Sequence, residues 1–404
     1  MLVGDYMMDT LPFNLNNMVK DAPIIIYGAS TYGEIAYVAL KELRLSPLYF
    51  CDRTKKGKYL GIEIIQPSQL VDFLNDNIII ASRDYFYDIK NTIMEIGCKN
   101  VFDMRELISM DLPLSKLSNI AKDMYAGRNS YINVAEHQNN EQINFHRLQY
   151  IVTERCSLRC KDCVSLMQYY QKPEDVDIDY YRESFERLLN LADNISELRI
   201  FGGEPFMNRG TYKLIERYAP LEKIASIQVY TNGTIIPDEN NLHAMESDKV
   251  TLHISNYIHN EERISHLVER IKNYAIKYFV RQYDSWEDCG NLDYRNHSVK
   301  ELENIFSRCV DRNCYTFFRG QFHRCPRSGF AMHLGAMPDV PNDYVDFTDK
   351  EKSDQTLREE LMKLCQKTFI EACNYCDGID YGLERTHIPA GEQVEKPLKY
   401  KRRE

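Results

Sequence analysis

The chain has 404 residues, and 50 Lys and Arg against 60 Asp and Glu give a formal net charge of −10. Hydrophobic residues make up 44% and charged residues 27%, so the chain can bury cores and extended disorder is excluded. The acidic balance argues against a general nucleic-acid binder. A mean hydropathy of −0.48, with no apolar run near the roughly 18 residues that a membrane helix needs, argues against a membrane span. The length predicts about two to four domains.

The cysteines are the most informative residues of the composition. The first residues, MLVGDYMMDTLPFNLNN, contain acids and lack the apolar centre of a secretory signal, which predicts a cytoplasmic protein. In that reducing compartment the 12 cysteines are more often metal ligands or reactive thiols than disulfides. Three of them lie within residues 156–163 and seven between residues 289 and 376. This distribution predicts two metal sites.

Residues 1–118 predict a small α/β domain. Apolar strands at 23–27 and 47–51 flank a helical pattern at 34–43, and further strands fit 77–81 and 100–103. Gly28 and Gly33 match two glycines of the dinucleotide-binding fingerprint, whereas Ser30 replaces the middle one. The segment resembles Rossmann-like domains at the start of bacterial surface-sugar enzymes. Three roles stay open: nucleotide binding, docking of a sugar nucleotide or acyl carrier, and a structural domain.

The rest of the chain predicts four further segments. Residues 119–144, with many Asn and Ser, are expected to be a linker, and residues 145–300 alternate strand and helix as a parallel α/β sheet does. Its expected strands are 147–153, 197–201, 226–230, 250–255 and 276–281. Residues 301–380 are expected to be a separate domain, and residues 381–404 a solvated polar tail. In parallel sheets the chemistry sits in loops at the carboxyl ends of the strands.

A group of three cysteines follows the first of these strands. Cys156, Cys160 and Cys163 have three and two residues between them. Structural zinc takes four ligands, and no fourth Cys or His lies close by in the sequence. Three thiolates on one short loop suit a [4Fe–4S] cluster whose fourth iron stays open for a substrate.

The cysteine spacing resembles the defining motif of the radical S-adenosylmethionine (SAM) superfamily. Later motifs agree with this resemblance at the ends of the next three strands: Gly202-Gly203-Glu204-Pro205, Thr231-Asn232-Gly233 and Ser255-Asn256. The resemblance implies a partial (β/α)6 barrel and SAM binding by Gly202, Gly203, Glu204, Asn232 and Ser255. Family members commonly carry an aromatic residue where this chain has Asp162, so Tyr150 or another aromatic residue is expected to stack on adenine.

The same resemblance implies a specific chemistry. An external one-electron donor such as flavodoxin or ferredoxin reduces the cluster, and SAM on the open iron is cleaved to methionine and a 5′-deoxyadenosyl radical. That radical then removes a hydrogen atom from the substrate, while the protein supplies ligation, orientation and exclusion of water.

A second set of cysteines lies downstream. Cys309 is followed by Gly320 after ten residues and Cys325 after four more, and then by Cys373 and Cys376. This spacing resembles the twitch subdomain, a shortened relative of SPASM domains, and implies one auxiliary [4Fe–4S] cluster. Gly320 is expected to form a tight hairpin turn. Cys314 competes with Cys309 for a ligand place, and a structural zinc site is the alternative.

The C-terminal half also resembles twitch enzymes of the aminocyclitol dehydrogenase type. This implies oxidation or epimerisation of a small polar substrate, sugar- or cyclitol-like, free or nucleotide-linked. Candidate hydrogen donors are Cys289, Cys365 and the unused member of the Cys309/Cys314 pair, and a buried structural cysteine is the alternative for each. His253 shares the strand face of Ser255, and Arg281 ends the fifth strand where it suits an anionic substrate group. The competing hypotheses are a peptide-modifying radical SAM maturase and a non-catalytic metal-binding scaffold.

Overall fold

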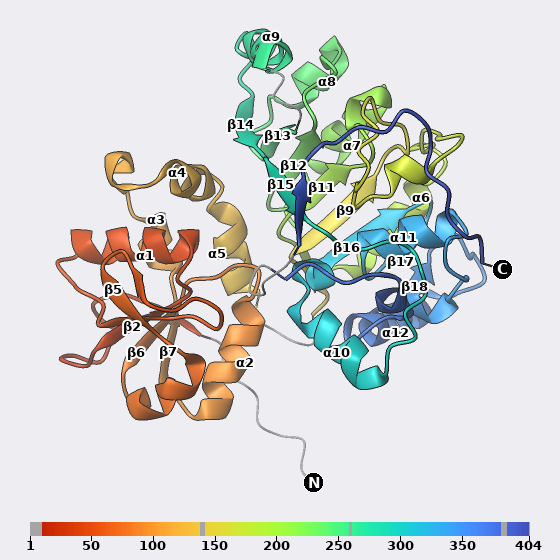
Figure 1. The fold of residues 1–404 in the computed structure, drawn as a ribbon. Helices are drawn as coiled ribbons and strands as arrows, with labels where there is room; N and C mark the ends of the chain where they lie inside the picture. The colour runs from red at the N-terminus through yellow and green to blue at the C-terminus, as the bar shows by residue number, and fades with distance from the viewer. Residues whose placement is uncertain (1–9, 138–141, 258–260, 381–385, 404) are drawn as a thin grey trace. The chain divides into compact units, whose positions relative to one another are not determined.

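The computed structural model describes residues 10–137, 142–257, 261–380 and 386–403 (Figure 1). The chain forms two compact units, residues 1–141 and 142–404, and each has a mixed α/β fold as predicted. Among the described helices, none is long and apolar enough to cross a membrane.

The N-terminal unit is built on a mostly parallel sheet of order β1-β7-β6-β2-β3-β5-β4. Its central strands β2 and β6 are buried at every position, because isoleucine-rich strands of a parallel sheet are covered on both faces. The predicted strands are confirmed, while β1, β4 and β5 are additions. The elements are β1 (Leu11–Pro12), β2 (Ile24–Tyr27), α1 (Thr31–Glu42), β3 (Tyr49–Cys51), β4 (Lys58–Tyr59), β5 (Ile62–Ile65), β6 (Asn77–Ile80), α2 (Phe86–Ile96), β7 (Asn100–Asp103) and α3 (Arg105–Ser109).

The glycines of the loop after β2 have a packing reason of their own. A Cβ atom on Gly28, whose φ is +125°, would lie 2.5 Å from the Ala81 carbonyl oxygen, and one on Gly33 would lie 2.0 Å from the carbonyl oxygen of Gly28. The backbone of Ala29 is already bonded, since its N–H donates to Asp52 at 3.0 Å. These glycines are therefore required by strand–helix packing, and nucleotide binding in this loop stays a prediction.

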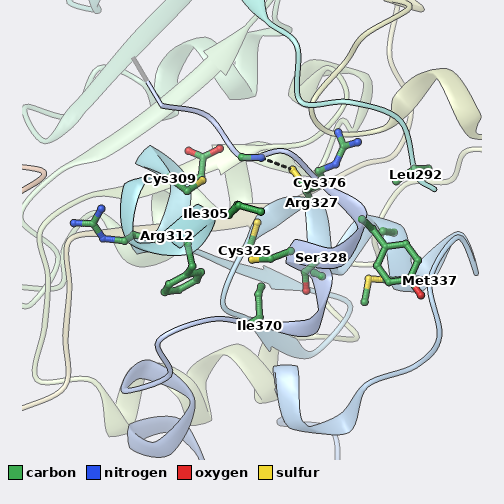
Figure 2. A pocket seen from close by; sticks show the side chains of 17 residues that line it. Leu292, Ile305, Cys309, Arg312, Cys325, Arg327, Ser328, Met337, Ile370 and Cys376 are labelled. Carbon is green, nitrogen blue, oxygen red and sulfur yellow. Dashed lines mark hydrogen bonds between the residues drawn. The ribbon is translucent and has the colours of Figure 1, made fainter. Parts of the chain in front are cut away.

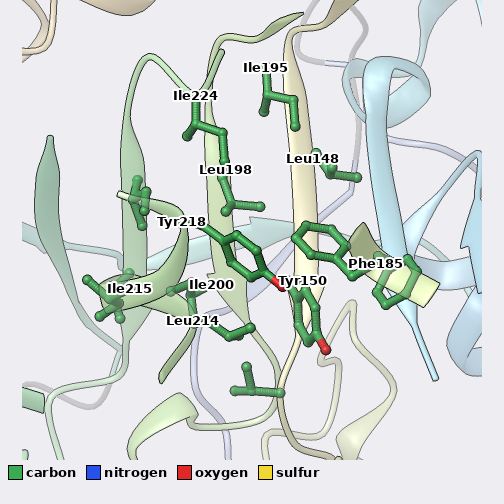
Figure 3. Close-up of a cluster of buried hydrophobic side chains, with 14 of the residues drawn as sticks. Leu148, Tyr150, Phe185, Ile195, Leu198, Ile200, Leu214, Ile215, Tyr218 and Ile224 are labelled. Atoms are coloured by element: carbon green, nitrogen blue, oxygen red, sulfur yellow. The ribbon is translucent and has the colours of Figure 1, made fainter. Parts of the chain in front are cut away.

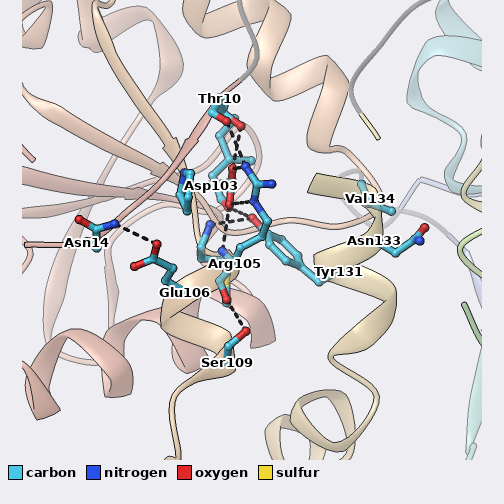
Figure 4. A network of polar contacts seen from close by, with 12 residues as sticks. Thr10, Asn14, Asp103, Arg105, Glu106, Ser109, Tyr131, Asn133 and Val134 are labelled. Carbon is cyan, nitrogen blue, oxygen red and sulfur yellow. Dashed lines mark hydrogen bonds and ion pairs between the residues drawn. The ribbon is translucent and has the colours of Figure 1, made fainter. Parts of the chain in front are cut away.

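The expected linker at 119–144 is wrong for most of its length. Helices α4 (Asn119–Ala126) and α5 (Asn129–Glu136) occupy it, and Tyr131 and Val134 are buried in the core of the N-terminal unit. Figure 4 shows Tyr131 beside a buried network in which Asp103 accepts hydrogen bonds from Arg105 Nε (2.9 Å) and Thr10 Oγ1 (3.0 Å). Apolar residues at helical spacing outweigh the polar composition of this segment. Residues 138–141 lie outside the described residues.

The second unit contains one sheet of order β14-β13-β12-β11-β9-β16-β17-β18. Strands β14 to β16 in that order are parallel, and β17 and β18 continue antiparallel. The five predicted strands are present as β9 (Arg147–Ile151), β11 (Leu198–Phe201), β12 (Ile227–Thr231), β13 (Val250–Asn256) and β14 (Lys277–Gln282). The remaining strands of the sheet are β16 (Cys314–Phe318), β17 (Gln321–His323) and β18 (Tyr344–Asp346).

The separate domain expected at 301–380 is corrected by this sheet. β16 pairs with β9 in parallel, so residues from the C-terminal part complete the hydrogen bonds of the first strand and no boundary separates the two. The hairpin turn at Gly320 is confirmed, because Phe318 pairs with Gln321 and both intervening residues have positive φ, as a two-residue type I′ turn requires.

Helices between the strands bury the core of this unit. They are α6 (Arg182–Leu191), α7 (Thr211–Tyr218), α8 (Glu239–Ala244), α9 (Glu261–Ile271), α10 (Val299–Arg308), α11 (Pro326–His333) and α12 (Asp354–Cys365). Two further two-stranded sheets are formed by β8 (Asn144–Phe145) with β10 (Asn194–Ile195) and by β15 (Ser285–Glu287) with β19 (His387–Pro389). Tyr150 is 1% exposed and packs edge-on against Phe185 at 4.8 Å (Figure 3). Adenine stacking on Tyr150 is therefore wrong, because its ring belongs to the core.

The solvated tail expected at 381–404 is also corrected. After β19, the Leu398 N–H donates to the Gln168 carbonyl at 2.8 Å, and the Tyr400 hydroxyl donates to the Leu334 carbonyl at 2.7 Å. The ring of Tyr400 also packs edge-on against Tyr169. Partners distant in sequence hold residues 386–403 against the second unit, whereas residues 381–385 lie outside the described ranges.

Candidate functional site

A cavity of about 490 Å³ lies at the carboxyl ends of the parallel strands. Its lining comes from the loops after β9, β11, β12, β13 and β14, where parallel α/β sheets place their sites. The predicted site residues that line it are Cys156, Cys160, Cys163, Gly202, Gly203, Asn232, Ser255, Arg281 and Cys289. Motifs separated by more than a hundred residues in sequence thus face one space.

The three-cysteine loop (residues 156–163) presents sulfur atoms that favour a metal. Burial, with the neighbouring Cys163 sulfur as the next cause, raises the pKa of Cys160 to about 11. Burial also raises the pKa of Cys156 and of Cys163. Cys160 is buried, and Cys156 and Cys163 are half-buried. Three adjacent thiolates repel one another unless a cation neutralises them, so the donor set fits an iron–sulfur cluster whose binding would displace the protons.

The two glycines after β11 allow the motif loops to approach closely. A Cβ atom on Gly203 would lie 2.2 Å from the Arg155 carbonyl oxygen and 3.0 Å from Cys156 Cβ. A Cβ atom on Gly202 would lie 2.6 Å from the carbonyl oxygen of Thr153. Any larger residue would push the three-cysteine loop away from the end of β11, which explains why glycine occupies both positions.

Glu204 lies behind the cavity wall. It is completely buried, and its carboxylate accepts the Asn232 N–H and the Thr231 hydroxyl, each at 2.8 Å. Burial raises the pKa of Glu204 to about 7, although both hydrogen bonds lower it. The side chain therefore ties the Gly202-Gly203 loop to the Thr231-Asn232-Gly233 turn. Direct contact of Glu204 with the amino group of SAM stays a prediction.

We expect the Glu204→Gln variant to gain stability relative to the parent chain as pH rises. The pKa of Glu204 is about 7 in the folded chain and 4.5 ordinarily. Between about pH 4.5 and 7 the carboxyl is therefore ionised in the unfolded chain but still protonated in the folded one, so the parent chain loses stability as pH rises through this range. At about 1.4 kcal/mol for each pKa unit, the difference in free energy of unfolding should grow by about 3 kcal/mol between pH 4.5 and 8. Urea unfolding of both proteins at the two pH values checks this, and a constant difference would contradict it.

Aromatic residues that the sequence analysis missed line the other wall of the cavity. Tyr257 packs edge-on against Trp286 at 5.1 Å, and the Arg281 guanidinium lies 4.9 Å from the ring centre of Tyr283. Aromatic faces of this kind suit adenine or the apolar face of a sugar ring. The signal was present in the sequence, since the single tryptophan of the chain follows the fifth strand closely.

His253 is not brought to the cavity. Its ring stacks beneath Tyr230 with centroids 4.6 Å apart, and Nε2 contacts the Gln228 side chain. Tyr230, which lines the cavity, therefore covers it. The expected substrate contact of His253 is corrected, because strand alternation gives the face of a residue but not its depth below the strand end.

A second cavity is lined by four cysteines, Cys309, Cys325, Cys373 and Cys376 (Figure 2). Burial raises the pKa of Cys309 to about 12 and raises those of Cys325 and Cys373. Four thiolates are the ligand set of a closed [4Fe–4S] cluster, so the donor chemistry fits one. The four cysteines line one cavity, although among the described residues no group of three His, Cys, Asp or Glu side chains is gathered closely enough to hold a single metal ion.

Cys314 does not line this second cavity. It begins β16, is fully buried in the sheet, and its sulfur accepts a hydrogen bond from Gln149 Nε2 at 3.0 Å. Of the two competing cysteines, the structure therefore places Cys309 at the second cavity and Cys314 in the sheet.

Cys289 stands in the wall between the two cavities. It lines the first cavity and interacts electrostatically with Cys376, which lines the second, while its thiol donates its hydrogen bond to the Glu287 carbonyl oxygen at 3.9 Å. The neighbouring Cys289 thiol lowers the pKa of Cys376. The buried Arg327 lies close by and donates to the Gly290 carbonyl at 2.7 Å. Two neighbouring cysteines thus line one cavity each, Cys289 the first and Cys376 the second.

Two parts of the chain are similar to known protein families. Residues 150–281 match the family model of the radical SAM superfamily, and residues 20–101 match the model named C2185-like, N-terminal. The segment that carries the three-cysteine loop and the glycine pair is thus similar to radical SAM domains.

The curated relatives that match are similar over a short stretch. GTP 3′,8-cyclase of Geobacter sulfurreducens is 34% identical over 98 residues, which is 24% of this chain and 29% of that protein. GTP 3′,8-cyclase of Desulforamulus reducens is 32% identical over 101 residues, 24% of this chain and 30% of the relative. The chain thus spans about three tenths of the length of these relatives.

Two solved structures are also similar. One is BtrN in complex with AdoMet and 2-DOIA, with 15% identity, a TM-score of 0.37, and coverage of 63% of this chain and 98% of that one. The other is native anSMEcpe with bound AdoMet, with 16% identity, a TM-score of 0.36, and coverage of 63% and 92%.

Proposed function

We propose that this protein is a radical SAM enzyme that acts on a small polar, sugar- or cyclitol-like substrate. The observation that carries the proposal is the meeting of the three-cysteine loop, the glycine pair, Asn232 and Ser255 in one cavity. When bound there, a [4Fe–4S] cluster and SAM supply reductive cleavage of SAM and a 5′-deoxyadenosyl radical.

The residues of the first cavity have separate tasks in this proposal. The thiolates of Cys156, Cys160 and Cys163 each hold one iron and leave the fourth open. The side chains of Asn232 and Ser255 offer polar groups to SAM, and the aromatic wall around Trp286 excludes water from the reacting atoms. The described contacts of Arg281 include no carboxylate, which suits binding of an anionic substrate group.

We also propose that Cys309, Cys325, Cys373 and Cys376 hold one auxiliary [4Fe–4S] cluster, in a twitch-like arrangement. A cluster with four cysteine ligands has no open iron, so its task is electron transfer. In an oxidation such a cluster would supply a place for the electron that the substrate loses, and the neighbouring Cys289 and Cys376 would offer a short route between the two cavities. In an epimerisation Cys289 instead donates a hydrogen atom.

Two observations support a sugar-like or nucleotide-linked substrate over a peptide. A peptide maturase usually carries a winged-helix recognition domain, whereas the N-terminal unit here is a mostly parallel α/β sheet. The curated relatives are named as cyclases of GTP, which is compatible with a nucleotide-linked substrate. The Rossmann-like role of the N-terminal unit and a flavodoxin or ferredoxin as electron donor belong to the same proposal.

Anaerobic incubation of the reconstituted full chain with SAM and dithionite tests the proposal. Release of 5′-deoxyadenosine supports a radical SAM enzyme. A non-catalytic metal-binding scaffold releases none although its iron is in place, and that result would overturn the proposal.

The Cys289→Ala variant is expected to keep about eight irons per chain but to shift the auxiliary cluster to a more negative potential. The variant loses the neighbouring thiol that favours the Cys376 thiolate, and without that thiol the reduced, more negative cluster is less stable. The shift should be roughly 50 mV, close to the 59 mV of a tenfold change in a one-electron equilibrium. Redox titration followed by electron paramagnetic resonance (EPR) measures it.

Cys365→Ala is the matched control for that variant. Cys365 ends α12 and lines neither described cavity, so its removal should leave both potentials unchanged. An unchanged potential in Cys289→Ala would remove the proposed route between the two cavities.

A further inference from the structure

The segment after β19 lies against the three-cysteine loop as a short antiparallel strand. Cys160 and Gln393 form an isolated β-bridge. The Lys161 N–H donates to the Glu392 carbonyl at 2.7 Å, and the Val394 N–H donates to the Arg159 carbonyl at 2.9 Å. The loop that supplies the cysteines is therefore paired with chain more than two hundred residues downstream.

The side chain of Gln393 reaches the sulfur of Cys160. Its Oε1 accepts the Arg159 N–H at 2.7 Å, while its Nε2 donates to Cys160 Sγ at 3.2 Å and to the Gly391 carbonyl at 2.7 Å. The orientation of the amide is determined, because a backbone N–H requires the oxygen end and a carbonyl requires the nitrogen end. The amide N–H therefore faces the cysteine sulfur.

Contacts on both sides hold Gln393 in place. Upstream, β19 pairs with β15, and Gly391 has a φ of +75° at a point where a Cβ atom would lie 2.7 Å from the Tyr257 carbonyl oxygen. Downstream, the Leu398 N–H donates to Gln168, whose side-chain amide donates to the Cys163 carbonyl at 3.3 Å. Residues 387–398 thus form a strap, anchored at both ends, across the loop.

We propose that Gln393 is a positioning residue that makes the cluster of the three-cysteine loop easier to reduce. The inference rests on the proposed function, because it requires a cluster on Cys156, Cys160 and Cys163. Reduction adds one electron and makes the cluster more negative, so an N–H donor on a ligand sulfur stabilises the reduced form more than the oxidised form. The electron comes from the external one-electron donor, and no proton transfer is needed.

The test is an EPR-monitored redox titration of the reconstituted full chain, following the signal that changes when SAM is added. In Gln393→Ala the equilibrium constant for reduction should fall about tenfold, a shift of about 59 mV to more negative potential. Gln393→Glu should shift the potential at least as far. This variant is isosteric and keeps an acceptor for the Arg159 N–H, but it loses the donor to the Cys160 sulfur and to the Gly391 carbonyl and adds a negative charge. The backbone bonds of Lys161 and Val394 still hold the strap on the loop.

Glu392→Gln is the matched control. It removes only the 3.4 Å ion pair with Lys161, in which both side chains are 48% exposed, and should leave the potential unchanged. If Gln393→Glu keeps its iron and its cluster has the same reduction potential as that of the parent protein, Gln393 has no such role, and the proposed function is unaffected. If the parent protein shows no SAM-responsive cluster, the proposed function fails and the inference falls with it.

Discussion

Replacement of Cys156 by alanine is expected to abolish release of 5′-deoxyadenosine and to lower the iron content from about eight to about four atoms per chain. Cys156 lies where β9 ends, and Asn232 Nδ2 approaches its sulfur at 3.5 Å. Loss of a cluster ligand should reduce SAM cleavage by more than about 100-fold, since changes outside the ligand shell already cost 10–100-fold. Iron analysis and chromatography of the SAM cleavage products measure both effects.

Cys98→Ala is the control for this experiment. Cys98 is buried in the core of the N-terminal unit and lines neither of the two cysteine-lined cavities. The control should keep about eight irons and the parent rate of cleavage. Parent activity and iron in Cys156→Ala would show that the three-cysteine loop is not the site, and the proposed function would be lost with it.

The second large effect is expected from a matched pair in the C-terminal part, Cys309→Ala and Cys314→Ala. Cys309 lines the second cavity, so its removal should cost about four irons and the EPR signal of the auxiliary cluster. Cys314 lies in β16 and bonds to Gln149, so its removal should cost no iron. The two replaced cysteines are only five positions apart in the sequence, and they differ in their place in the fold.

The auxiliary cluster has its own contradicting result. A metal content of four irons and one zinc per parent chain would show that the four cysteines hold a structural zinc ion and no auxiliary cluster, since four cysteines also bind zinc. Equal iron loss in both variants would show that Cys314 takes part in ligation despite its place in the sheet.

Much of the site could be predicted from local sequence. Apolar runs such as those of β2, β6 and β12 bury both faces, so they form strands almost regardless of their neighbours. The three cysteines lie within eight residues, and the glycines follow a strand end directly, so their roles depend on short stretches of chain. The order of parallel strands then brings the motif loops to one edge of the sheet.

Other features could not be predicted from local pattern. The segments 119–136 and 386–403 are polar in composition, yet Tyr131 and Tyr400 find buried partners in distant segments. Cys309 and Cys314 are five residues apart, and their separation follows from the pairing of β16 with β9, more than 150 residues away in sequence. The same holds for Trp286 in the cavity wall.

Spacing along the chain therefore specified the ligand-rich loops and the elements around them, because hydrogen bonds and side-chain periodicity act over a few residues. The choice between equivalent cysteines, the contact of Gln393 with Cys160 and the joining of the C-terminal hairpin to the sheet depend on which surfaces meet when the chain folds. Those contacts are selected by packing and by pairing of backbone groups far apart in sequence, which no short stretch of residues encodes.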